Sequence, residues 1–104
     1  MAERLTIKRG ATFRIRRALP ADLRGATFRA EVRAMGSGSL VGELSVRELD
    51  GGNTICLLEL ESATHDWPLT VLSADIWAEF PGGDSVVSST IHIEVQRNVT
   101  LREA

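Results

Sequence analysis

The stretch Leu69-Thr-Val-Leu-Ser-Ala-Asp-Ile-Trp-Ala-Glu-Phe80 alternates between apolar and polar side chains along most of its length. One face carries Leu72, Ala74, Ile76, Ala78 and Phe80, and the other carries Asp75, Trp77 and Glu79. Alternation with a period of two predicts a β-strand with one buried side and one solvent-facing side. Pro81-Gly-Gly-Asp84 follows directly and predicts a turn, because glycine and proline adopt the backbone angles that turns need.

Segments on both sides of this strand show the same period. We expect seven strands, at residues 5–7, 12–17, 27–35, 40–49, 54–60, 69–80 and 85–96. No segment of ten or more residues has a helical period. Short strands at this spacing predict an all-β, immunoglobulin-like antiparallel sandwich that forms a single domain, residues 1–104.

Two of these strands allow finer expectations. Residues 54–60 are apolar on both faces, which predicts a central strand that is covered on both sides. In residues 85–96, alternation places Val87, Ser89, Ile91, Ile93 and Val95 inward. A hairpin that turns at Gly83-Asp84 sets His92 opposite Asp75 on the outer face, as an exposed pair.

The single cysteine and the first residues restrict the class of protein. Cys56 lies in an apolar strand pattern, so we expect a small buried hydrophobe and no internal disulfide. Ser62 is expected to cap one helical turn that Pro68 helps to end. The charged start of the chain is no signal peptide, and no apolar run approaches the roughly 20 residues that cross a bilayer. We therefore expect a protein that folds in a reducing cytoplasm and is not associated with a membrane.

The net charge of −2 conceals an uneven distribution along the chain. Residues 1–52 hold ten Lys and Arg against six acids, whereas residues 53–104 hold two against eight. Such a split either cancels by pairing within one sandwich, which we favour, or steers two copies or two partners together.

No residue pattern indicates an active site, a metal site or a cofactor. The two histidines, His65 and His92, stand apart, and no Gly-x-Ser-x-Gly motif presents a serine nucleophile. The spacing of cysteine and histidine that binds zinc, an acidic calcium loop and a phosphate-binding glycine motif are all missing. We therefore predict that the chain is not an enzyme and holds no cofactor or metal. An enzyme would need a cleft that joins His92 to an acid.

Five exposed side chains are candidates for binding a partner. Arg14, Arg16, Arg29 and Arg33 are expected to line one sheet surface, and Trp77 points outward by alternation. Nucleic acid is disfavoured, because stacking aromatics are missing among these arginines and the pI is about 5.6. A solvated or salt-bridged sheet face explains the arginines better. Trp77 is either covered by the chain tail, where Val99 and Leu101 continue an extended pattern, or anchors a partner.

Several stretches, in their order along the chain, resemble a known family. They are Leu5-Thr-Ile-Lys-Arg-Gly10 with Thr12-Phe13, Phe28-Arg-Ala-Glu-Val-Arg33, Leu58-Glu-Leu-Glu-Ser-Ala-Thr64, Ala74-Asp-Ile76, Pro81-Gly-Gly83 and Ile93-Glu-Val95 with Val99-Thr100. The chain resembles small bacteriophage and prophage structural proteins whose immunoglobulin-like sandwich is similar to the N-terminal domain of siphophage baseplate upper proteins. The resemblance implies a non-enzymatic tail or baseplate protein, found in the bacterial cytoplasm during assembly and then in the virion. It also implies partners among other tail or baseplate subunits, or self-association into a homo-oligomer, and carries over no catalytic residue.

The alternative hypothesis is a small ligand-binding sandwich that recognises a carbohydrate or a peptide. Trp77, Asp75 and Glu79 share one outward face, where they would form a shallow site. In either case, an exposed sheet edge can bind a partner strand by β-augmentation.

Overall fold

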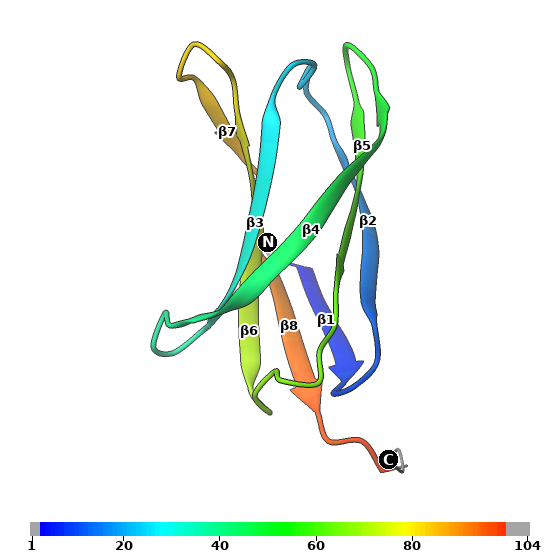
Figure 1. Cartoon of the computed structure of the whole chain (residues 1–104), viewed down its shortest axis with the longest axis vertical. Helices are drawn as coiled ribbons and strands as arrows, with labels where there is room; N and C mark the ends of the chain where they lie inside the picture. Colours follow the sequence, from blue (N-terminus) through cyan, green and yellow to red (C-terminus); the bar gives the residue numbers. More distant parts are fainter. Residues whose placement is uncertain (1–2, 100–104) are drawn as a thin grey trace.

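The structure is a computed structural model that describes residues 3–99, and Figure 1 shows its strands. The strands are β1 (Glu3–Lys8), β2 (Phe13–Leu19), β3 (Thr27–Ala34), β4 (Leu40–Gly51), β5 (Cys56–Ser62), β6 (Val71–Glu79), β7 (Ser85–Val87) and β8 (Ile91–Gln96). The described residues contain no helix, and so none that is long and apolar enough to cross a membrane. Every expected strand is present, and the last one is divided in two.

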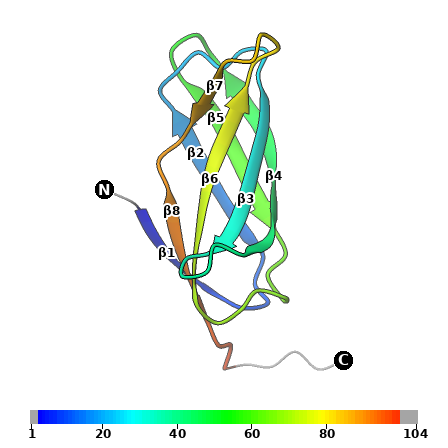
Figure 2. The ribbon, with the colours of Figure 1, turned by 90° about the vertical axis from the view of Figure 1, so that its left-hand side faces the viewer.

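Hydrogen bonding links the strands in the order β1-β8-β6-β3-β4-β5-β2, with β7 paired to β6 beside this path. The long strand β4 pairs first with β3 and then with β5, so it passes from one layer to the other (Figure 1). One layer holds β1, β8, β7, β6 and β3, and the other is built on β5 and β2 (Figure 2). This is the strand arrangement of an immunoglobulin-like sandwich, nearly closed into a barrel, and it confirms the predicted fold class.

One strand pair departs from the expected antiparallel pattern. β1 runs parallel to β8, from Glu3 opposite Ile91 to Lys8 opposite Gln96, whereas all other pairs are antiparallel. After β1 the chain crosses to the other layer to begin β2, and it turns at Gly10, whose φ is +99°. This positive φ is costly for any residue with a Cβ atom, which explains a glycine at that position.

The core lies between the two layers and follows the predicted alternation. Its fully buried side chains include Leu58 and Leu60 of β5, Leu72 and Ile76 of β6 and Ile93 of β8. Because opposite layers supply them, the apolar faces bury one another, which is the main favourable contribution to folding.

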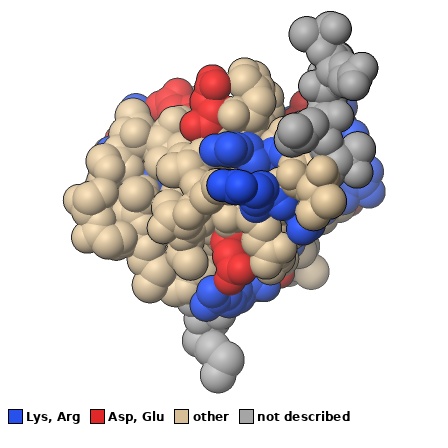
Figure 3. All heavy atoms as spheres, turned by 90° about the horizontal axis from the view of Figure 1, so that it is seen from below, with Lys and Arg blue, Asp and Glu red and all other residues tan. Residues whose placement is uncertain are grey.

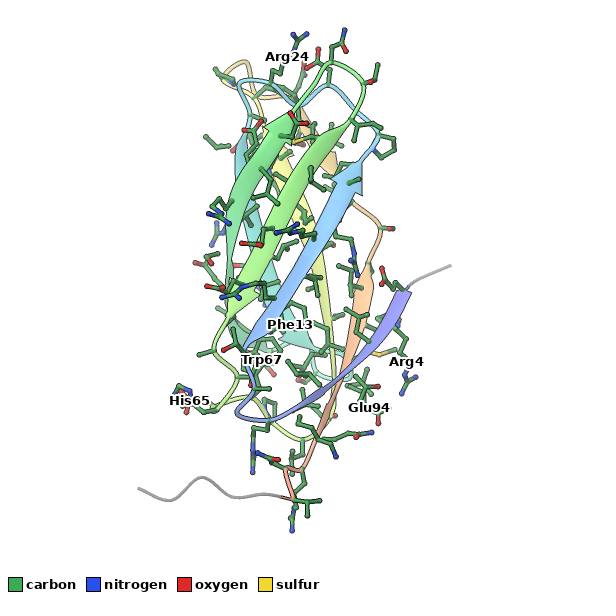
Figure 4. The ribbon with its side chains drawn as sticks, turned by 90° about the vertical axis from the view of Figure 1, so that its right-hand side faces the viewer. Arg4, Phe13, Arg24, His65, Trp67 and Glu94 are labelled. Atoms are coloured by element: carbon green, nitrogen blue, oxygen red, sulfur yellow. The ribbon has the colours of Figure 1, made fainter. Side chains whose placement is uncertain are left out.

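A tryptophan closes one end of the core. Trp67 is 4% exposed and packs against Phe13, the first residue of β2, with ring centroids 5.5 Å apart (Figure 4). The buried Thr64 hydroxyl accepts a hydrogen bond from Gly10 N at 2.9 Å and donates one to the Ala11 carbonyl, so it ties the β5–β6 connection to the β1–β2 turn. After Ser62 the chain forms one hydrogen-bonded turn, from Trp67 N to the Thr64 carbonyl at 3.0 Å, but no helix. Ser62 does not cap this turn, because it is the last residue of β5 and its hydroxyl donates to the Ala63 carbonyl.

The expectation that β5 is covered on both faces is wrong. β5 is central, between β4 and β2, and Cys56, Leu58 and Leu60 are fully buried. The outer side of its layer faces solvent, however, so Leu57 is only half-buried, and Ile55, just before the strand, is 55% exposed. Cys56 is the small buried hydrophobe expected from its pattern: burial, with the nearby Glu48 and Asp50 carboxylates, raises the pKa of its thiol.

The predicted strand at residues 85–96 is broken between β7 and β8. Four residue steps on β6, from Ala78 to Ala74, oppose five steps on the other side, from Val86 to Ile91. The extra residue is a β-bulge, at which the Ser88 hydroxyl accepts the hydrogen bond of Ile76 N at 2.9 Å in place of a backbone carbonyl.

This bulge overturns two expectations, because one added residue reverses the direction of every side chain before it. Val87 pairs with Trp77 and is 47% exposed instead of inward, and Ser89 is exposed as well. His92 lies opposite Ser73 and not opposite Asp75, so the expected His92–Asp75 pair does not form.

Candidate functional site

Trp77 lies on the outer face of β6, as alternation predicts, and is 45% exposed. Its cross-strand neighbours are Arg29 on β3 and Val87 on β7. Figure 2 is drawn from the side of this layer. Trp77 and Val87 therefore form a small exposed apolar patch near the open edge of the sheet. Residues 100–104, the part of the tail that could have covered Trp77, lie outside the described residues.

Acidic side chains surround the tryptophan. A shallow depression of about 720 Å³ is lined by Thr27, Phe28, Arg29, Glu31, Glu43, Asp75, Trp77 and Glu79. Arg29 binds two of these acids, with its Nη2 atom 3.0 Å from Glu43 and 3.1 Å from Glu31. Asp75 and Glu79 have no ion-pair partner within residues 3–99. We call this depression, together with Val87, the Trp77 face; it combines an exposed aromatic ring with excess negative charge.

The four candidate arginines do not line one sheet surface, which corrects that expectation. Arg14 and Arg16 lie on β2 and pair with Glu61 and Glu59 of β5. Arg29 and Arg33 lie on β3, in the other layer, where both bind Glu31. Alternation correctly predicted that each arginine side chain points outward. It does not reveal to which layer each strand belongs. All four guanidinium groups pair with carboxylates, so each arginine face is salt-bridged.

Glu59 connects two strands on the outer face of the β2–β5–β4 layer. Its carboxylate lies 2.8 Å from Arg47 of β4 and 3.5 Å from Arg16 of β2. Burial acts to raise the pKa of Glu59, but hydrogen bonds and charge from Arg47 and Arg16 outweigh it and lower the pKa. The ionised carboxylate is therefore the favoured form in the folded chain.

Ion pairs within one molecule cancel part of the charge split along the chain. Arg14, Arg16 and Arg47 come from the basic half of the sequence, and Glu59 and Glu61 come from the acidic half. In the other layer Arg4 of β1 pairs with Glu94 of β8 at 2.6 Å (Figure 4). These contacts are the internal pairing favoured from the sequence, and they leave Asp75 and Glu79 without such partners.

A narrow seam separates the two ends of the curled sheet. Arg17 of β2 points inward at this seam, and its Nη2 atom lies 2.6 Å from a Glu3 carboxylate oxygen of β1. Nη1 donates to the Arg16 carbonyl at 2.7 Å, whereas Nε and Nη2 are buried and make no well-aligned hydrogen bond. The alternation of Phe13, Ile15 and Arg17 predicts this inward arginine, although Arg17 was not among the expected site residues.

Beside the Glu3–Arg17 pair, which lines it, the seam widens into a groove of about 360 Å³. Its walls are Arg17–Ala21 on the β2 side and Val86–Ser89 with Ile91 on the β7–β8 side. We call it the seam groove.

The end of the sandwich near the C-terminus is basic. Lys8 and Arg9, at the end of β1, lie beside Arg97, because Lys8 Nζ contacts the Arg97 carbonyl and Arg9 N donates to Gln96. Figure 3 shows Lys and Arg atoms gathered on this end. The cluster is exposed, and no other described residue at this end points to a ligand.

The histidines do not join a catalytic arrangement. His65 Nε2 lies 3.4 Å from Asp66, and both side chains are largely exposed in a loop. His92 is flanked by Arg4 on β1 and Ser73 on β6. In the described part of the chain no three His, Cys, Asp or Glu side chains converge as metal ligands would.

No family model matches the chain, and no curated protein matches it.

Proposed function

We propose that this chain is a non-enzymatic assembly protein of a phage or prophage tail or baseplate. It acts through protein–protein contacts made by the Trp77 face. The observation that carries the proposal is the exposure of Trp77, at 45%, beside Val87, at 47%. Tryptophan is enriched among the residues that dominate binding energy at interfaces, and a large exposed ring with an apolar neighbour is typical of such an anchor.

The scaffold supports this role. Trp77 stands on β6, which pairs with β3, β7 and β8, so its main chain is fixed before any partner arrives. A rigid strand avoids the entropy cost of ordering the main chain on binding. The paired arginine faces, by contrast, already satisfy their charges within the molecule.

The resemblance to phage structural proteins supports the particular class of assembly. An immunoglobulin-like sandwich with a solvent-facing anchor suits a small subunit that joins larger tail or baseplate proteins. Its partner on this proposal is another tail or baseplate subunit, met in the bacterial cytoplasm and kept in the virion.

The test is the presence of the chain in particles. A tagged copy is expressed in the bacterium that carries the gene, the prophage is induced, and purified particles are analysed by mass spectrometry. We expect the wild-type chain in the particles, Trp77→Ala strongly depleted, and the control Met35→Ala retained, since Met35 is exposed in the β3–β4 loop and does not line the Trp77 face. Absence of the wild-type chain from particles would overturn the proposal.

A second candidate function rests on the shape of the same face. An aromatic ring in a shallow depression with carboxylates, here Trp77 with Asp75 and Glu79, also suits a sugar ring. Binding of a glycan on an array, lost in Trp77→Ala, would favour this function. The absence of any glycan hit would favour the protein partner.

A further inference from the structure

The outer edge of β7 is an open edge of the sheet. β7 pairs with β6 only, and within residues 3–99 no strand lies on its other side. The hydrogen bonds from Ser88 N to the Ile76 carbonyl and from Phe80 N to the Asp84 carbonyl show which residues of this ladder face β6. Because antiparallel pairs alternate, Val86 bonds to β6, whereas Ser85 and Val87 direct their N–H and C=O groups away from it. Two residues therefore present main-chain donors and acceptors at this open edge, and one of them, Val87, also lines the seam groove.

This edge lacks the protection that the outer edges of β1 and β2 carry. Natural proteins protect edge strands from unwanted pairing by placing charged side chains, some of them pointing inward, or proline on the edge. β2 has Arg14 and Arg16 outward and Arg17 inward, and β1 carries Arg4 and Lys8. β7 consists of Ser85-Val86-Val87, without a charge or a proline.

The seam groove supplies the space for another strand beside this edge. Val86 and Ile91 offer apolar surface on one wall, and Leu19 and Ala21 offer it on the other. Arg17 also lines the groove, with its charge already paired to Glu3 at 2.6 Å.

We propose that β7 binds an extended segment of a partner protein as an added strand. Its inward side chains are apolar and enter the seam groove, and its outward side chains are lysine or arginine. The inference rests on the proposed function, in that both place a protein partner at the Trp77 face, and it adds the mode of binding and the chemistry of the partner.

The charge of the Trp77 face selects the basic segment. Strands in a sheet lie about 4.8 Å apart, so an added strand lies about 10 Å from β6. The side chains of Asp75 and Glu79, together with a lysine or arginine of the segment, span that distance. The same cation can lie over the ring of Trp77. An acidic segment would instead face like charges, which disfavours binding.

The test uses two short synthetic peptides, one alternating Val with Lys and the other Val with Glu, each labelled for fluorescence anisotropy. We expect the wild-type chain to bind the lysine peptide at least about tenfold more tightly than the glutamate peptide. The double variant Asp75→Lys, Glu79→Lys should reverse this preference. Binding of neither peptide, or equal binding of both, would overturn the proposal.

A proline at the open edge tests the hydrogen bonds directly. Val87→Pro removes an N–H group that does not bond to β6, so the ladder keeps its bonds while the added strand loses a donor. We expect about tenfold weaker binding of the lysine peptide, whereas the control Val87→Thr keeps the N–H group and binds as the wild type. Unchanged binding by a folded Val87→Pro chain would overturn the proposal.

A second measurement does not depend on any variant. Addition of the lysine peptide should slow hydrogen exchange at the amides of Ser85 and Val87 in the wild-type chain. Exchange that stays unchanged there would overturn strand addition. The mass of the chain in solution, measured without peptide, distinguishes a second copy from a different protein. If this mass rises with concentration in the wild type but stays that of one chain in Val87→Pro, a second copy supplies the added strand. That result would overturn the assignment to a different protein.

The two proposals fail in different ways. If particles retain Val87→Pro but lose Trp77→Ala, the assembly function stands and strand addition at β7 is wrong. If the lysine peptide binds as expected but the wild-type chain is absent from particles, strand addition stands and the phage assembly function is wrong.

Discussion

β7 and β8 read as one continuous strand in the sequence, but they have opposite roles in the molecule. β8 lies between β1 and β6, and its Ile91, Ile93 and Val95 are buried. β7 pairs with β6 alone, and Val86 and Val87 are 39% and 47% exposed. Both strands carry apolar side chains, so it is the presence of a flanking strand on each side that places β8 in the core and leaves β7 outside it. The part without a second flanking strand keeps its apolar side chains exposed.

The largest expected effect comes from the buried half. Ile93→Ala removes a fully buried side chain from the core, so we expect the free energy of unfolding to fall by about 2–5 kcal/mol. Urea denaturation followed by tryptophan fluorescence measures this loss. A loss below about 1 kcal/mol would mean that β8 contributes less to the core than its burial implies.

Most of the fold could be predicted from alternation, because side-chain direction in a strand has a period of two. That rule placed Leu72, Ile76 and Ile93 in the core and Trp77 outside it. It could not reveal the bulge at Ser88, because a bulge changes the pairing of residues between strands and leaves no mark in the order of apolar and polar residues. The bulge nevertheless reverses the direction of the Val87 side chain. Whether a serine hydroxyl replaces a backbone acceptor depends on tertiary geometry.

The candidate site was predictable only in part for a related reason. Local pattern gives the face of a strand, so Arg14 and Arg29 were correctly expected to point outward. It does not give the partner strand, so their separation into two layers was missed. The seam between Glu3 and Arg17 joins the two ends of the sheet order and is equally invisible to local pattern.

The second prediction concerns the junction between the two halves. Ser88→Ala removes the hydroxyl that accepts from Ile76 N, so a backbone donor at a buried position loses its partner. We expect a loss of about 1–3 kcal/mol in the free energy of unfolding. Ser88→Thr keeps a hydroxyl and is the matched control. Equal stability of Ser88→Ala and wild type would show that the bulge does not depend on this bond.

The third prediction uses charge, which β8 has on its outer face and β7 lacks. A hydrogen bond from the Gln96 amide and one from Arg4 lower the pKa of Glu94 from its usual 4.5. A lowered folded-state pKa means that the ionised form favours folding. This contribution is complete above the unfolded-state pKa and is lost as the pH falls through the folded-state pKa.

Glu94→Gln should therefore lose stability relative to wild type at pH 6 and approach it at low pH. Urea midpoints measured between pH 6 and pH 2 test this, and Ser85→Ala on β7 is the control without a charge. A difference between Glu94→Gln and wild type that stays constant with pH would assign the effect to packing instead of ionisation.

The smallest expected effect on stability comes from the exposed half. Val87→Thr changes a half-exposed side chain of nearly the same shape, so its free energy of unfolding should lie within about 0.5 kcal/mol of wild type. The same urea experiment that measures Ile93→Ala checks this value. If Val87→Thr instead costs as much as a core substitution, Val87 is packed in solution and β7 belongs to the core with β8. In that case no exposed edge remains for a partner, because the open main-chain groups of Ser85 and Val87 are accessible only while β7 stays outside the core.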